Sequence, residues 1–170
     1  PGPRGADRVS CVCGDRVYIG LGYDDLSASS CSKAFYAYDP VQKSWEKIAD
    51  FPGRSRCAPQ AFAIGDRLYV GGGYYKTSYG KQVLVDWYYY DLKRKDWVDH
   101  VLEFPLEAMT RVAFTKDQCG FVYTYDQRRL MYHYSRSDNR WAAMDCMPIA
   151  IDAVGPVVEE FFLVDNQPYC

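Results

Sequence analysis

Arginine, aspartate and tyrosine side chains gather in six loop-like segments of this chain. Three of these segments follow apolar, glycine-containing stretches and read GYDDLSASSCSK (22–33), GYYKTSYGKQ (73–82) and YDQRR (125–129). The other three read PGPRGADR (1–8), PGRSRCA (52–58) and PLEAMTR (105–111). Arginines with tyrosines around them suit a carboxylate, an acidic peptide or a sugar. These residues form one site only if the fold brings the segments together.

Familiar catalytic patterns are missing from the sequence. His100 and His133 are its only histidines, and each falls in a separate strand-like stretch, so nothing pairs them in one site. We find no Ser-His-Asp order and no metal-ligand spacing. The phrases GLGYDD and GGGYYK resemble glycine-rich nucleotide motifs, but no helix follows them to receive a phosphate. The sequence therefore predicts no catalytic residue, no metal and no cofactor.

Composition sets wider limits on function. The chain has 170 residues, is 48% hydrophobic and 25% charged, and carries a net charge of −2. These values are typical of a globular domain, and they give no basic field for nucleic acid. No apolar run approaches the roughly 20 residues that a membrane-spanning helix needs. We therefore expect one domain over residues 1–170, without a membrane-spanning segment and without a nucleic-acid partner.

Seven cysteines are distributed along the chain, and an odd number cannot all pair within it. No Cys-x-x-Cys spacing occurs, so neither a zinc site nor a thioredoxin-like redox motif is supported. Cys11 and Cys13 lie two residues apart, on one face of a strand-like stretch, where small apolar side chains fit. We expect mostly free thiols.

The tryptophans reveal an internal repeat. Trp45, Trp97 and Trp141 are 52 and 44 residues apart, and each follows a tyrosine by seven positions. The three segments read YDPVQKSW (38–45), YDLKRKDW (90–97) and YSRSDNRW (134–141). A hydrophobic residue and a proline follow each tryptophan, as in Phe51-Pro52. The period predicts three units of one architecture, each with its own share of the aromatic core.

Each unit contains four short strand-like stretches. In the second unit these are PQAFAIG (59–65), DRLYVGG (66–72), LVDWYYYD (84–91) and DWVDHVLEF (96–104). Gly14-Asp15 and Gly65-Asp66 are hairpin-turn signals between the first two strands. No stretch shows a convincing helical period, so the sequence predicts an all-β protein. A four-stranded antiparallel unit of 44–52 residues is typical of a β-propeller blade.

At these glycines, aromatic residues and turns, the chain resembles the kelch-repeat β-propeller family, in particular bacterial kelch-like proteins and galactose oxidase-like propellers. The resemblance implies blade units at about 1–52, 53–105 and 106–148 and a partial fourth at 149–170. The ring is then incomplete, and a fragment whose remaining blades come from missing chain, or from a second copy, is expected. We assign the strands that end at Gly20 and Gly71 to the inner part of the blades, where glycine permits close approach.

The resemblance also implies that ligands meet one rim of the ring, built by the six segments above. The candidate ligand-binding residues on this rim are Tyr23, Asp24, Asp25, Arg54, Arg56, Tyr74, Tyr75, Lys76, Arg111, Asp126 and Arg128. Our main hypothesis is a non-catalytic binding or scaffold module that recognises a protein or a carbohydrate through these loops.

The alternative hypothesis is a kelch-type sugar-acid isomerase similar to sialic acid epimerases. Its active site would lie in the channel mouth, with Asp24, Asp25, Arg54 and Arg56 as the first candidates. A copper radical oxidase like galactose oxidase needs two His and two Tyr ligands together, which this sequence does not supply. The resemblance implies the cell envelope or periplasm, although the cysteines leave the cytoplasm open.

Overall fold

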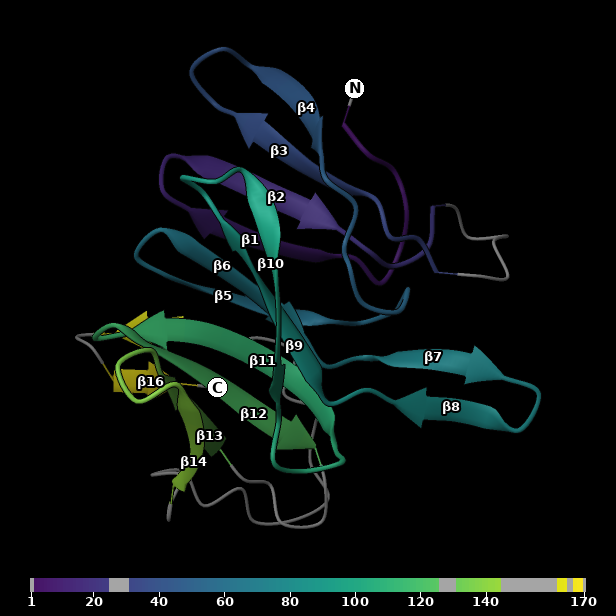
Figure 1. Ribbon diagram of the computed structural model, residues 1–170, viewed down its shortest axis with the longest axis vertical. Coiled ribbons are helices and arrows are strands. Elements are labelled where there is room, and N and C mark those ends of the chain that lie inside the picture. The colour runs from purple at the N-terminus through teal and green to yellow at the C-terminus, as the bar shows by residue number, and fades with distance from the viewer. Residues whose placement is uncertain (1, 25–30, 126–130, 145–161, 165–166, 170) are drawn as a thin grey trace.

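The computed structural model describes residues 2–24, 31–125, 131–144, 162–164 and 167–169. Within these ranges the chain forms strands and no helix, and its main part is three four-stranded antiparallel sheets that follow one another along the chain (Figure 1). The all-β prediction is therefore confirmed. The boundaries predicted for the repeat units, including the partial fourth unit, stay predictions.

The first sheet has the order β1 (Val9–Cys13), β2 (Arg16–Gly20), β3 (Phe35–Asp39), β4 (Ser44–Ile48). The second has the order β5 (Gln60–Ile64), β6 (Arg67–Gly71), β9 (Asp86–Asp91), β10 (Asp96–Glu103). The third has the order β11 (Met109–Lys116), β12 (Cys119–Tyr125), β13 (Met131–Ser135), β14 (Arg140–Met144). Two hairpins complete the description, namely β7 (Tyr74–Thr77) with β8 (Gly80–Val83), and β15 (Phe162–Val164) with β16 (Gln167–Tyr169).

The repeated tyrosines and tryptophans are direct cross-strand neighbours on the third and fourth strands of each sheet. The pairs are Tyr38 with Trp45, Tyr90 with Trp97, and Tyr134 with Trp141, with ring centroids 4.9, 5.5 and 5.3 Å apart. Such pairs contribute to sheet stability beyond the area that they bury. The seven-residue spacing therefore places one aromatic pair at the same position of every sheet.

Neighbouring sheets are joined through these aromatic residues. The Trp97 indole of the second sheet packs edge-on against Phe35 and Phe51 of the first, with centroids 5.3 and 5.1 Å away, and its N–H donates to the Ala49 carbonyl at 2.9 Å. A second aromatic cluster, which contains Trp87, joins the second sheet to the third. The second sheet thus buries one face against the first sheet and the other against the third.

The innermost strand of each sheet is the first one, because β1 packs against β5 and β5 packs against β11. Our assignment of the glycine-ending second strands to the inner position is therefore wrong. A Cβ atom on Gly71 would overlap the Trp87 indole, and one on Gly20 would overlap the Phe35 ring. These glycines make room for an aromatic side chain of the neighbouring strand.

Two-residue turns join the first strand to the second in all three sheets. Gly14 and Gly65 adopt left-handed backbone conformations, with φ of 63° and 59°, as hairpin turns of this length require. The third sheet has Asp117 and Gln118 instead, with φ of 50° and 62°. All three turns therefore have the same two-residue length, although the third lacks the Gly-Asp signal and has positive φ at both of its residues.

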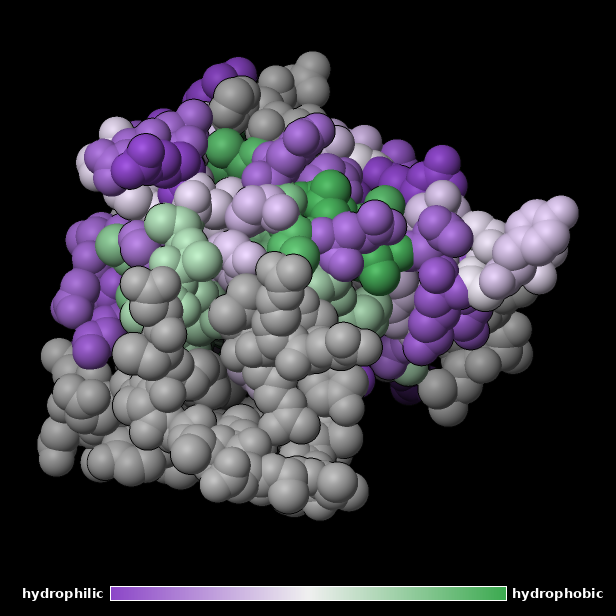
Figure 2. Space-filling view, turned by 90° about the horizontal axis from the view of Figure 1, so that it is seen from below, coloured by the Kyte–Doolittle hydropathy of each residue, from purple (hydrophilic) through white to green (hydrophobic). Residues whose placement is uncertain are grey.

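The β7–β8 hairpin interrupts the second sheet between β6 and β9. It projects from the body of the sheets on the right-hand side of Figure 1 and of Figure 2, which is the view from below. Tyr79 at its tip is exposed. The base of the hairpin therefore lies beside the crossing between the first and second sheets, whereas its tip faces solvent.

Asp66, in the β5–β6 turn, links the second sheet to the third. Its carboxylate accepts from the Lys93 ammonium at 2.8 Å and from the Arg136 guanidinium at 2.9 Å, and these contacts, Lys93 first, lower its pKa to about 2. Asp15 has the same turn position in the first sheet. The residue of the second sheet that corresponds to Arg136 is Leu92, and it lies against Gly14 in the turn of the first sheet.

We predict that Asp66→Asn lowers the free energy of unfolding near pH 7 by about 0.5–1 kcal/mol, the range of surface ion pairs. Because the folded pKa of Asp66 is depressed from 3.8, its contribution is complete above pH 4 and is lost as the pH falls towards 2. Urea denaturation at several pH values should show wild type and variant converging near pH 2. Asp15→Asn is the matched control, and an equal effect of both substitutions would contradict the assignment.

Candidate functional site

The crossings between sheets and the segments that follow the second strands meet on one side of the molecule, here called the rim. Ala6 of the first crossing pairs with Tyr23 after β2, and Cys57 of the next crossing pairs with Tyr74 after β6. The two halves are joined by a hydrogen bond from the Gly22 N–H to the Arg56 carbonyl at 3.0 Å. Hydrogen bonds thus join the rim segments of the first two sheets to one another.

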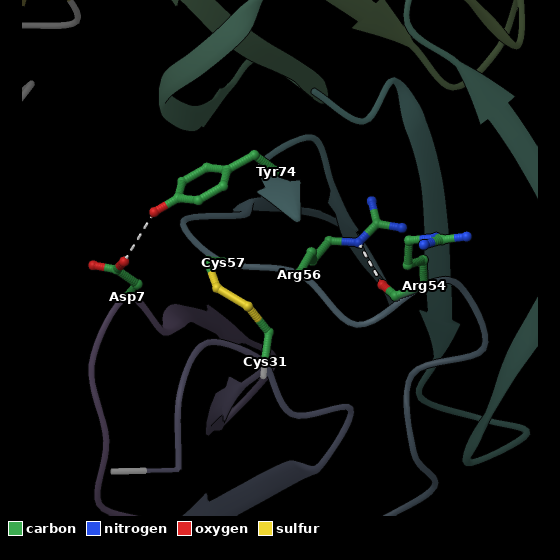
Figure 3. Close-up of a disulfide and its surroundings, with 6 residues drawn as sticks. All are labelled: Asp7, Cys31, Arg54, Arg56, Cys57 and Tyr74. Atoms are coloured by element: carbon green, nitrogen blue, oxygen red, sulfur yellow. Dashed lines mark hydrogen bonds between the residues drawn. A yellow bond between two sulfur atoms is a disulfide. The ribbon is translucent and has the colours of Figure 1, made fainter. Parts of the chain in front are cut away.

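A disulfide joins Cys31, at the end of the β2–β3 connection, to Cys57 in the crossing (Figure 3). Most of the described cysteines are free, as expected, but the sequence did not predict this bond, which the fold forms between two cysteines 26 residues apart. Burial raises the pKa of the free Cys13 thiol to about 11, so this thiol stays protonated at neutral pH. Cys11 and Cys119 are also free, whereas Cys146 and Cys170 lie outside the described residues.

Tyr23 and Tyr74 form the aromatic floor of the rim. Both are buried, and the Tyr74 hydroxyl donates to Asp7 Oδ2 at 3.3 Å (Figure 3). The Lys76 ammonium lies 4.9 Å from the centroid of the Tyr23 ring, and the Lys81 ammonium lies 4.2 Å from that of Tyr74. The nearby Tyr23 hydroxyl raises the pKa of Lys76, which keeps this exposed amine protonated.

Arg56 is fully buried and uses its guanidinium to hold the rim together. Nε donates to the Arg54 carbonyl at 3.0 Å, Nη1 to the carbonyls of Gly72 and Asp86, and Nη2 to Asp86 Oδ2 at 2.7 Å. The guanidinium also lies 4.8 Å from the centroid of the Phe51 ring. A buried charge is stable only when it is paired in this way. Arg56 therefore joins the crossing to the end of β6 and the start of β9.

The other predicted arginines of the described rim are exposed. Arg54 stacks on the Tyr75 ring, 4.2 Å from its centroid. Arg111 is the extra residue of a β-bulge in β11, between Thr110 and Val112. β-Bulges often reorient a side chain beside a functional site.

Asp24 carries an exposed carboxylate at the rim, with its side chain 65% accessible. It accepts from Arg8 Nη2 at 2.8 Å, and Arg8 also donates from Nε and Nη2 to the Arg4 carbonyl. Sequence reasoning did not name Arg8, Asp7 or Asp86 as site residues. Asp25, Asp126 and Arg128 lie outside the described residues.

A groove of about 470 Å³ opens between the first and second sheets at the opposite end of the strands from the rim. Arg16 is among the residues that line it, and its guanidinium is already paired with Glu46 at 2.9 Å and Asp39 at 3.6 Å. None of the predicted site residues lines this groove. The described residues contain no cluster of side chains suited to a metal ion and no helix that is long and apolar enough to span a membrane.

Comparison with known proteins finds relatives named as N-acetylneuraminate epimerases and a relative named as a kelch domain-containing protein. A family model described as N-acetylneuraminate epimerase matches residues 4–126. An N-acetylneuraminate epimerase of Vibrio cholerae is 38% identical over 116 residues, which cover 65% of this chain and 28% of that protein. One from Haemophilus influenzae is 40% identical over 93 residues, which cover 53% of this chain and 23% of that protein. A kelch domain-containing protein of Vibrio cholerae is 31% identical over 93 residues, 52% of this chain and 24% of that protein.

The solved structure of YjhT matches with a TM-score of 0.68 at 24% identity, covering 87% of this chain and 53% of YjhT. This likeness confirms the predicted kelch-type propeller of four-stranded antiparallel blades. The chain aligns with about a quarter of the length of the curated epimerases and about half of YjhT.

The prediction of a non-catalytic binding or scaffold module is wrong, because the relatives are named as epimerases. The names of these relatives favour the alternative, a sugar-acid isomerase. That prediction relied on the absence of familiar catalytic motifs, and the rim residues form no such motif.

We predict that Arg56→Met lowers the free energy of unfolding by about 3–5 kcal/mol, because it leaves the Asp86 carboxylate without its buried partner. Arg54→Met, on an exposed neighbour two residues away, should cost less than about 1 kcal/mol. Urea denaturation monitored by tryptophan fluorescence measures both. Similar losses in the two variants would show that Arg56 does not hold the rim together.

We also predict that the Cys31→Ser, Cys57→Ser double variant loses about 3 kcal/mol of stability, as expected for a loop of this length. Dithiothreitol should destabilise the wild type to the same extent and should not affect the double variant. Thermal unfolding with and without reductant makes this comparison. A wild type insensitive to reductant, with Cys31 and Cys57 both labelled by a thiol reagent, would contradict the disulfide.

Proposed function

The chain belongs to the N-acetylneuraminate epimerase family, and we propose that its rim forms part of an active site that epimerises N-acetylneuraminate. One observation carries the proposal. The Asp24 carboxylate and the Arg8 guanidinium, 2.8 Å apart, lie on the segments that adjoin the aromatic floor, where Tyr23 meets the Lys76 ammonium. Cations for binding a sugar acid and a carboxylate for moving protons therefore occur on one rim.

Epimerisation at the anomeric carbon of a sugar acid needs only proton transfers and a firm hold on the substrate. A base takes the proton of the anomeric hydroxyl, the bond between the anomeric carbon and the ring oxygen breaks, and the ring oxygen receives a proton. Rotation and closure on the other face reverse these transfers. In our proposal Asp24 moves the protons, because its exposed carboxylate can reach a bound sugar.

The remaining described candidates support binding in this proposal. Arg54, Tyr75 and Arg111 contact the sugar at the edge of the site, and Lys76 contributes a protonated amine. Arg56 acts indirectly, because its donors are committed to the protein. Asp25, Asp126 and Arg128 stay in the proposal as sequence-based candidates.

We propose that further blades extend the ring beyond the described sheets. Trp97 is buried against the first sheet, whereas the equivalent Trp45 is only half-buried on the outward face of that sheet. This difference supports the proposal that another blade covers Trp45, supplied by further chain or by a second copy. The protein partner in this proposal is the further chain or the second copy that supplies these blades.

The disulfide supports a location in the cell envelope. Disulfides persist in oxidising compartments, which include the bacterial periplasm, and are rare in the cytosol. Cys57 is fully buried at the rim, so its bond to Cys31 is part of the folded site. The proposed enzyme therefore acts on sugar acids outside the reducing cytosol.

We predict that the purified protein accelerates the interconversion of N-acetylneuraminate anomers and that Asp24→Asn lowers kcat by a factor of about 100 or more. Proton NMR of freshly dissolved sugar measures both rates. Asp15→Asn, in a turn at the other end of the strands, is the control and should keep full activity. A wild-type protein that leaves the spontaneous rate unchanged would refute the proposed function.

A further inference from the structure

We infer that Arg8 is the side chain that binds the carboxylate of the sugar acid, an inference that rests on the proposed function. Arg8 stands just before β1, and its side chain is only 10% exposed. Nε and Nη2 donate to the Arg4 carbonyl at 3.1 and 2.7 Å, and Nη2 also donates to Asp24 Oδ1. These contacts fix the plane of the guanidinium.

The third nitrogen of this guanidinium has no acceptor. Arg8 Nη1 is buried, and no described residue accepts a hydrogen bond from it. A buried donor without a partner costs folding free energy, so such an atom in a charged group requires an explanation. Nη1 and Nη2 together form the edge of the guanidinium that binds a carboxylate through two parallel hydrogen bonds. A substrate carboxylate on this edge satisfies Nη1.

Asp24 makes this exchange feasible. Its side chain is exposed and occupies Nη2 alone, through one oxygen. An incoming carboxylate takes the place of Asp24 on Nη2 and adds the contact to Nη1. The displaced Asp24 then stays beside the substrate as the group that moves protons.

The other arginines of the described rim are less suited to this role. The guanidinium of Arg56 is inaccessible and already bonded to Asp86 and to backbone carbonyls, and that of Arg54 stacks on Tyr75. Arg111 is different, because it repeats the position of Arg8. Each lies six residues before the first residue of a β-hairpin turn, Gly14 in one sheet and Asp117 in the other.

The repeat places this second arginine on the same rim. β1 and β11 lie on either side of β5, so Arg8 and Arg111 flank the position that Pro59 takes in the second sheet. Arg111 is exposed, whereas the Arg8 side chain is only 10% exposed and its Nη1 is buried without an acceptor among the described residues. We therefore assign the fixed carboxylate contact to Arg8 and a contact elsewhere on the sugar acid to Arg111.

The experiment compares N-acetylneuraminate with its methyl ester, which lacks the negative charge, by titration calorimetry and by anomer exchange in NMR. Wild type should bind the free acid more tightly than the ester. Arg8→Gln should abolish this preference, with a loss of roughly 10–100-fold in affinity for the acid and little change for the ester. KM should rise more than kcat falls. Arg94→Gln, in an exposed turn outside the site, is the matched control.

Two further variants keep the inference testable if Arg8→Gln does not fold. Arg8→Lys retains the charge but not the two-pronged geometry, and it should lose part of the preference for the acid. Asp24→Asn removes the competing carboxylate, so it should bind the free acid at least as tightly as wild type while turning it over more slowly. Weaker binding by Asp24→Asn would contradict the exchange.

The outcomes separate this inference from the proposed function. A wild type that neither binds nor epimerises the acid overturns both. A wild type that is active, together with an Arg8→Gln or Arg8→Lys variant that keeps the full preference for the acid, overturns the role of Arg8 alone.

Discussion

The arrangement of the rim depends on one buried ion pair, that of Arg56 with Asp86. A guanidinium without solvent contact has to be paired, and here it bonds to the Asp86 carboxylate and to carbonyls from three segments. These bonds fix the crossing between the first and second sheets. The crossing in turn orients Arg54, carries Cys57 and its disulfide, and accepts the Gly22 N–H of the first sheet. Tyr74 of the rim also pairs with this segment, at Cys57.

Much of the fold could be predicted from the sequence because the spacing of residues in the repeat determines which of them pair across strands. The seven-residue spacing of Tyr90 and Trp97 makes them cross-strand neighbours around a short turn, and the same spacing recurs in all three sheets. The turn of the third sheet could not be predicted in this way. Asp117 and Gln118 adopt there the left-handed conformation that glycine adopts in the other two. The third sheet therefore keeps the two-residue length of the turn with different residues in it.

The site was harder to predict because its residues are defined by contacts between segments. Cys31 and Cys57 show no pairing signal in the sequence, since the crossing alone brings them together. Arg54 and Arg56 look alike in a polar loop, yet one is exposed and the other fully buried. Arg8 could have been found by counting back from the hairpin turns, because the same count reaches Arg111 in the third unit. The repeat thus contained more information about the site than loop composition did.

Arg8 and Arg56, which lie in the first two crossings, have different roles in this propeller. Arg56 has acceptors for each of its nitrogens and holds the backbone, whereas Arg8 is also fixed in orientation but its Nη1 has no acceptor among the described residues. A group that is fixed in place and incompletely bonded is pre-organised, because binding does not have to order it. The single contact that has to yield, to the exposed Asp24, releases a carboxylate where a proton has to move. Binding and proton transfer are therefore coupled through one exchange of partners on Arg8.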